Sequence, residues 1–211
     1  MRDVVARFAD GSAAGQPVAV LDIEASAFPA PGSFPVEIGV SYVATGETRS
    51  WLLAPTRFWR LRGTWDIGAE RVHGIRQRKL VDRGLPPERV LAELRAAVEG
   101  HTVVSENPGA DAYWLRVLDH AVETAGRDLG GWGDIIIGIC DRPALFPIRR
   151  ADALLDELTV SGGLAGAAEI ETARDEATRR LGRKPHRAGP DSRHVAEVFR
   201  VLMGADGRPS H

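Results

Sequence analysis

The chain has 211 residues, of which 44% are hydrophobic and 27% charged, as is typical of a globular protein with a single core. Its formal net charge of −2 argues against a protein that coats nucleic acid by bulk attraction. One cysteine, Cys140, excludes an internal disulfide framework and a cysteine-rich zinc site, and no apolar run approaches the length of a membrane span. These features favour a cytoplasmic protein that does not enter a membrane.

The first predicted elements are β-strands. Val18–Ile23 is a short apolar run of the kind that a buried strand gives. Val36–Val43 and Arg49–Leu53 follow, and the turn residues 45–47 between them predict a hairpin. A fourth strand is expected at His101–Ser105.

Helices make up most of the remaining chain. They are expected at Glu70–His73, Pro87–Val98, Ala110–Ala121, Arg150–Leu158, Ala167–Leu181 and Pro190–Met203. Ile135–Cys140 fits either a strand or a buried helical turn, because periodicity does not separate the two. The order of elements predicts a mixed sheet covered by helices. We expect one domain over residues 18–203, between a flexible lead-in at residues 1–17 and a flexible tail at residues 204–211.

Two acidic residues, Asp22 and Glu24, end the first predicted strand. Residues two apart in a strand point to the same face, so these carboxylates repel each other and lose hydration. A divalent cation makes such an arrangement favourable, and hard oxygen ligands select Mg²⁺ or Mn²⁺. The pattern is also common by chance, which leaves a solvated strand end as the alternative. Glu37, on the next strand, is either a partner of this site or exposed.

Asp111 and Asp191 each open a predicted helix. Asp111 precedes Leu115 and Leu118, and Asp191 precedes Val195, at spacings that place each aspartate above an apolar face. An acidic residue in a first helical turn is usual as a partner of the helix dipole, but that role usually turns it toward solvent. Both carboxylates are therefore expected to face the sheet, where four would converge.

His186 lies on a loop rich in proline and glycine, five residues before Asp191. A lone histidine is more often a surface or core residue than a catalyst. Here the loop leads directly into the Asp191 helix, which would bring the imidazole to the carboxylates. A neutral imidazole in that place is suited to take a proton from an attacking water.

Two basic stretches have two interpretations each. Arg179, Arg180, Arg183 and Lys184 precede the histidine and either guide a strand toward the carboxylates or form a solvated helix end. Residues 57–62 mix arginines with aromatic residues, a combination that can stack bases and hold phosphates. Packing of these aromatic residues against the predicted hairpin is the interpretation that we favour.

In this order, the acidic segments resemble the DEDDh family of 3′–5′ exonucleases, over most of residues 18–203. The segments that carry the resemblance are Val18–Ser26, Phe34–Val40, Ala69–Ile75, Thr102–Asp111 and His186–Asp191. The chain departs from the common pattern at Ala110, where many members have Phe, and at Glu106, where His is frequent. These departures put the choice of substrate in doubt more than the activity.

The resemblance implies an α/β protein with an RNase H-like fold, in which helices flank a mixed five-stranded sheet with an antiparallel meander and parallel strands. It implies a hydrolase that releases nucleoside monophosphates from the 3′ end of single-stranded DNA or RNA with two divalent cations, Mg²⁺ or Mn²⁺. The implied metal ligands are Asp22, Glu24, Asp111 and Asp191. The implied general base is His186, and Ala25, Ser26 and Asn107 would line the pocket of the terminal nucleotide.

Two other functions stay open. A catalytically silent domain of the same fold would bind nucleic acid or protein, although all five active-site positions are present. A nuclease that cuts internally would keep the chemistry and attack a circular strand. The sequence also leaves open the preferred sugar, a partner protein, and whether the protein forms a homodimer.

Overall fold

The structure is a computed structural model and describes residues 12–13, 16–127, 131–162, 167–183 and 185–204. Its strands are β1 (Ser12–Ala13), β2 (Gln16–Ala25), β3 (Pro35–Tyr42), β4 (Thr48–Leu52), β5 (Thr102–Ser105) and β6 (Ile148–Arg150). Its helices are α2 (Arg57–Arg62), α3 (Ile67–His73), α4 (Gln77–Arg83), α5 (Pro87–Val98), α6 (Pro108–Glu123), α7 (Trp132–Cys140), α8 (Ala151–Gly162), α9 (Ala167–Leu181) and α10 (Ala188–Leu202).

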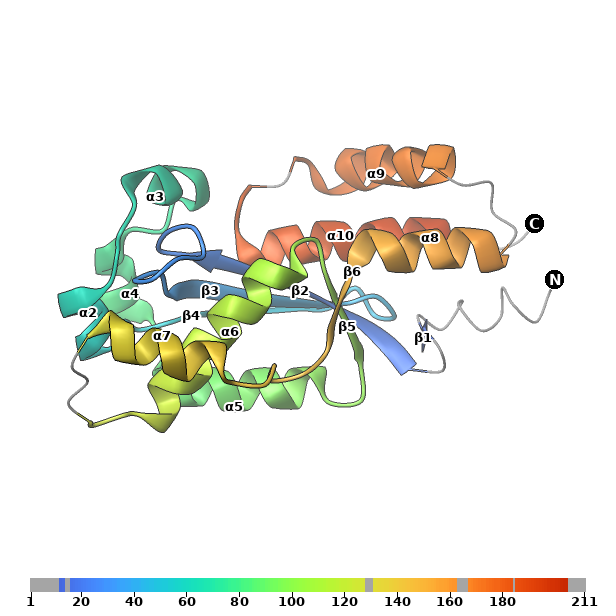
Figure 1. Ribbon diagram of the computed structural model, residues 1–211. Coiled ribbons are helices and arrows are strands. Elements are labelled where there is room, and N and C mark those ends of the chain that lie inside the picture. Colours follow the sequence, from blue (N-terminus) through green and yellow to red (C-terminus); the bar gives the residue numbers. More distant parts are fainter. Residues whose placement is uncertain (1–11, 14–15, 128–130, 163–166, 184, 205–211) are drawn as a thin grey trace.

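Five strands form one mixed sheet in the order β4–β3–β2–β5–β6, and the short β1 pairs with the start of β2. Strands β2, β3 and β4 are antiparallel neighbours, whereas β5 pairs in parallel with both β2 and β6. Helices α8, α9 and α10 lie on one side of the sheet and α5, α6 and α7 on the other (Figure 1). The mixed five-stranded sheet flanked by helices is thus confirmed. Among the described residues, no helix combines the length and the apolar character needed to cross a membrane.

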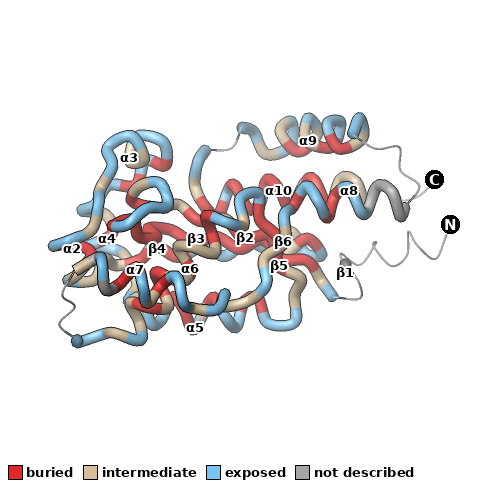
Figure 2. Tube along the Cα trace, in the orientation of Figure 1, coloured by how far each residue is buried: buried red, intermediate tan, exposed pale blue. Residues whose placement is uncertain are grey.

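The sheet separates two apolar cores, and β2 contributes to both because its side chains alternate. Leu21 and Ile23 join the core that includes helices α5 and α6. Val18 and Val20 face the opposite core, which includes Phe199 of α10. Buried residues follow the sheet and the inner sides of the helices on both sides (Figure 2).

Most predicted elements are present, with shifted ends. Helices α5 and α9 have the predicted limits, and 135–140 is helical, as part of α7. Strand β6 was missed, because it has three residues, two of them arginines, and it runs directly into α8. The short helices α2 and α4 were also missed, and α10 begins at Ala188, two residues earlier than expected. The domain limits stay a prediction, since residues 1–11 and 205–211 lie outside the described part.

The start of α10 packs against the face of β3 that points away from the α5–α6 core. Val36, Ile38 and Val40 enter the α5–α6 core, so the residues between them point the other way. At Gly39 the two backbones nearly touch, because a Cβ atom built there would lie 2.2 Å from the Ala188 carbonyl carbon. Only glycine allows α10 to approach the strand this closely.

We predict that Gly39→Ala destabilises the protein by about 1–3 kcal/mol or more, because the added methyl group must push α10 away from β3. Urea unfolding followed by circular dichroism measures the change. Gly133→Ala is the matched control, since its Cβ would meet no atom within 4 Å and the change lies within a helix, where alanine is favoured. Equal stability of Gly39→Ala and wild type would contradict the close contact.

Candidate functional site

Three carboxylates meet where β2 ends. Asp22 and Glu24 continue the face of Val18 and Val20, and α10 brings the buried Asp191 to the same place. One ligand oxygen from each carboxylate can be chosen so that all three lie within 4.8 Å of one another. Three of the four carboxylates expected to converge therefore share one small space.

The fourth carboxylate, Asp111, lies in the first turn of α6 and is only 3% exposed. It accepts a hydrogen bond from the hydroxyl of Ser105 at the end of β5. The same hydroxyl accepts the Asn107 backbone N–H at 2.9 Å, so the β5–α6 turn fixes the carboxylate. Asp111 lies outside the group of three, but its charge acts on Asp22.

Burial and mutual repulsion make ionisation of these carboxyls unfavourable. Burial is the largest cause that raises the pKa of Asp22 well above its usual range, followed by the charges of Asp111 and Glu24. Burial and then Asp191 raise the pKa of Glu24 to about 7. Burial also raises the pKa of Asp111 to about 7, although the hydrogen bond from Ser105 opposes the shift. The charge of a divalent cation would oppose all three shifts by stabilising the ionised carboxylates, and oxygen-only ligands fit Mg²⁺ or Mn²⁺.

Glu37 is buried, which settles the alternative left open by the sequence. Arg187 donates two hydrogen bonds to its carboxylate, one of them from Nε at 2.7 Å. The backbone N–H of Ala188 donates a third, at 3.0 Å. Glu37 therefore holds the first residues of α10 against β3. Arg187 was not expected as the partner of Glu37, although alternation along β3 places Glu37 on the face opposite Ile38 and could have indicated the need for a cation there.

His186 lies at the edge of the site. Its side chain is 64% exposed, and Nδ1 lies 4.0 Å from Oδ2 of Asp191. Its φ of 51° is in the left-handed region, where few residues other than glycine are found. The backbone thus adopts a costly conformation at the residue expected to act as the base.

An apolar pocket of about 360 Å³ adjoins Glu24. It is lined by Ile23, Glu24, Ala25, Ala27, Phe28, Asp66, Gly68, Ala69, Val72, His73 and Trp114. Phe28 is 84% exposed at its rim. Ala25, one of the three residues expected to contact the terminal nucleotide, lines this pocket. The hydroxyl of Ser26 instead accepts the backbone N–H of Phe34 and closes the β2–β3 loop, and Asn107 is exposed at the start of α6.

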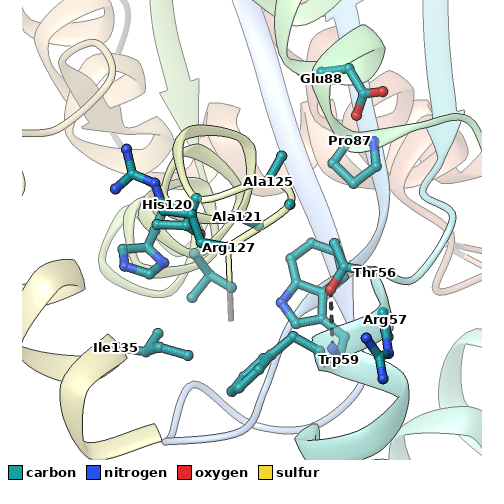
Figure 3. A pocket seen from close by; sticks show the side chains of 14 residues that line it. Thr56, Arg57, Trp59, Pro87, Glu88, His120, Ala121, Ala125, Arg127 and Ile135 are labelled. Carbon is teal, nitrogen blue, oxygen red and sulfur yellow. Dashed lines mark hydrogen bonds between the residues drawn. The ribbon is translucent and has the colours of Figure 1, made fainter. Parts of the chain in front are cut away.

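A second cavity, of about 260 Å³, lies between α2, α5, α6 and α7 (Figure 3). Its described lining contains one carboxylate, Glu88, and none of the four at the sheet end. Trp59 beside it is buried and stacks on Phe34 with ring centroids 5.1 Å apart. Thr56 caps this helix by accepting the Trp59 backbone N–H. For Trp59, packing rather than base stacking is therefore the observed role.

Comparison with known proteins supports the fold. No protein-family model matches the chain, and no curated protein sequence matches it. Among solved structures, S. pombe Pop2p in its Mg²⁺- and Mn²⁺-bound form is similar with a TM-score of 0.54 and 15% identity, over 99% of this chain and 90% of that one. The RNase domain of the yeast Pop2 protein has a TM-score of 0.52 and 12% identity, over 97% of this chain and 81% of that one.

The metal-free form of the E. coli ExoI–ssDNA complex is also similar, with a TM-score of 0.51 and 12% identity. The match covers 91% of this chain but 40% of ExoI, so the chain corresponds to less than half of that enzyme. At these identities the likeness establishes the fold alone, a mixed sheet flanked by helices that this chain shares with Pop2p, the Pop2 RNase domain and part of ExoI.

We predict that Asp22→Asn makes the metal-free protein more stable than wild type at pH 8, by about 2 kcal/mol. Burial, and then the charges of Asp111 and Glu24, raise the pKa of Asp22 well above its usual range, so ionising this carboxyl at pH 8 destabilises the folded wild type, whereas the amide of the variant carries no charge. Because the pKa of Asp22 is raised on folding, the wild type loses stability as pH rises above the unshifted value of 3.8, and the difference between the two proteins is smaller at pH 5 than at pH 8.

Urea unfolding at both pH values, with EDTA or Mg²⁺, measures these effects. Mg²⁺ at 100 times its Kd should stabilise the wild type by about 2.7 kcal/mol and the variant much less. The control is Asp175→Asn, an exposed residue on α9, which should respond as wild type does. A destabilised Asp22→Asn protein at pH 8 would contradict the account of the cluster.

We further predict strong coupling between Glu37 and Arg187. Glu37→Gln leaves the guanidinium without its charged partner, and loss of one member of a buried pair costs about 3 kcal/mol. Glu37→Gln/Arg187→Met should cost less than the sum of the single changes, with a coupling energy above about 1 kcal/mol. The free energies of unfolding of the four proteins test this, and additive values would contradict a structural pair.

Proposed function

We propose that the protein is a metal-dependent 3′–5′ exonuclease that releases nucleoside monophosphates from single-stranded DNA or RNA. The observation that carries the proposal is the convergence of Asp22, Glu24 and Asp191, with Asp111 close by, at one end of an RNase H-like sheet. Buried like charges destabilise a fold unless a ligand compensates them, which favours a functional over a structural reason for the cluster.

Asp22, Glu24 and Asp191 would hold one divalent cation, and Asp22 would contribute to a second, with Asp111 completing the site. When bound, the two cations would polarise the scissile phosphate and stabilise the charge that develops on the attacking and leaving oxygens. The protein supplies a fixed set of oxygen ligands. Ser105 and the Glu37–Arg187 pair hold two of the elements that carry them.

His186 is proposed as the general base that removes a proton from the attacking water. Its ring is exposed enough to meet solvent, and it is 4.0 Å from Asp191 in the ligand-free protein. Catalytic hydrogen bonds are often long before a substrate binds, so this position is compatible with the role.

The apolar pocket beside Glu24 is proposed to hold the 3′-terminal nucleotide. Ala25 and Val72 offer apolar surface to a base, and Phe28 and Trp114 offer aromatic surface. A pocket of about 360 Å³ has room for one nucleotide, which favours an end over the interior of a strand. This is the support for exonuclease rather than endonuclease action.

We predict that 5′-labelled single-stranded oligonucleotides shorten from the 3′ end when Mg²⁺ or Mn²⁺ is present and stay intact with EDTA. Asp22→Asn, which keeps the shape of the side chain but loses its charge, should give no ladder. His186→Gln should slow shortening by about 10²–10⁴-fold. Parallel DNA and RNA substrates of one sequence, resolved on a denaturing gel, would rank the two sugars.

A circular single strand separates the alternatives. It should stay intact, and its cleavage would indicate internal cutting. If neither DNA nor RNA shortens although Mn²⁺ binds to the wild type, the exonuclease proposal is wrong. Binding of the intact strands would then favour a silent binding domain.

A further inference from the structure

A groove of about 420 Å³, separate from the pocket beside Glu24 and from the cavity beside Trp59, lies beside the start of α10. Its lining comes from three places: the edge strand β4, the α9–α10 connection and the first turns of α10. The lining residues include Ser50, Arg183, Pro185, Gly189, Pro190, Arg193 and His194. The proposed function does not use any of them.

The groove is basic. Among the described residues that line it there are two arginines and no acidic residue. Arg183 and Arg193 are both exposed, and neither makes an ion pair or side-chain hydrogen bond to another part of the chain that the structure describes. Because their charges are not neutralised locally, the two guanidinium groups are available to an anion.

The neighbouring arginines of α9 differ. Arg179 pairs with Glu176, and Arg180 pairs with both Glu176 and Glu197. Of the four basic residues that precede His186, the structure therefore leaves Arg183 for a ligand, while Lys184 lies outside the described residues. Positive charge is concentrated in the groove and neutralised along the helix.

The groove also offers polar contacts and room. Ser50 lies against Gly189, where an added Cβ atom would lie 3.1 Å from the Cβ of Ser50 and 3.2 Å from its hydroxyl oxygen. Gly189 and Pro190 are in the first turn of α10, whose positive dipole end favours an anion. His194 donates to or accepts from Thr178, with 3.0 Å between Nε2 and Oγ1, and so ties α9 to α10 and fixes one wall.

The groove borders the segment that carries His186 and Asp191. Pro185 immediately precedes His186, and Pro190 immediately precedes Asp191. A strand whose 3′ end lies at the carboxylates can therefore pass the start of α10 and enter the groove. We propose that the groove binds the phosphodiester backbone of the substrate strand upstream of its 3′-terminal nucleotide, with Arg183 and Arg193 each contacting a phosphate. This inference rests on the proposed exonuclease function.

Direct binding tests the inference without requiring hydrolysis. A fluorescein-labelled 20-nucleotide single strand is titrated in EDTA with wild type and with Arg183→Ala/Arg193→Ala, at several salt concentrations. We expect affinity to fall on the order of tenfold at low salt, and the slope of log K against log salt to decrease by about 1.4. The control is Arg76→Ala/Arg83→Ala, which removes two exposed arginines around α4 and the same net charge.

Hydrolysis separates the groove from the catalytic centre. The p-nitrophenyl ester of thymidine 5′-monophosphate has one nucleotide and cannot reach the groove. The groove variant should hydrolyse this ester as wild type does, while its KM for the 20-nucleotide strand rises on the order of tenfold and kcat is unchanged.

The outcomes are distinct. If the two double variants have equal effects on strand affinity and on the salt slope, the groove proposal is wrong, because Arg183 and Arg193 then contribute no more to strand binding than Arg76 and Arg83 do. A wild type that hydrolyses neither substrate, but whose affinity still depends on Arg183 and Arg193, would refute the proposed function and leave strand binding in the groove supported.

Discussion

The contact between β3 and the start of α10 determines the geometry of the site. Strand β3 presents Glu37, Gly39 and Ser41 to the helix, while the residues between them fill the apolar core. Gly39 sets how closely the backbones approach, and Glu37 anchors the helix start through three donors. Further along, the hydroxyl of Ser41 lies 3.0 Å from that of Ser192. These contacts fix the distance and rotation of α10, and hence where Asp191 stands relative to β2.

The carboxylate cluster works against the stability that these contacts provide. Different contacts fix the position of each element that carries a carboxylate. Strand β2 is central in the sheet, α6 is fixed through Ser105, and α10 is fixed through Glu37. Because no member can move away without disturbing its element, the repulsion is stored in the folded protein. A rigid, electrostatically unfavourable centre is what a cation-binding site requires, since the ligands need little reorganisation when the ion arrives.

The sequence predicted the features that depend on the periodicity of side chains in strands and helices and on the order of the elements along the chain. Alternation in β2 placed Asp22 and Glu24 on one face, and helical spacing placed Asp111 and Asp191 toward the sheet. It did not predict β6, whose three residues are too few for a periodic pattern, nor the pairing of Arg187 with Glu37 across 150 positions. It also did not separate the paired from the unpaired arginines near His186. Those features depend on tertiary contacts between distant segments, which a local pattern does not contain.

The alternation of β2 has a consequence for folding fidelity. Val18 and Val20 share a face with Asp22 and Glu24, whereas Leu21 and Ile23 fill the opposite core. If β2 slipped by one residue against β3, both carboxylates would enter an apolar core and two large apolar side chains would leave it. Misregistered pairings are thus strongly disfavoured during assembly of the sheet. Asp22 and Glu24, which are proposed to bind metal, therefore also help to specify the register of β2. Uncharged residues at these two positions would weaken the selection of the correct alignment.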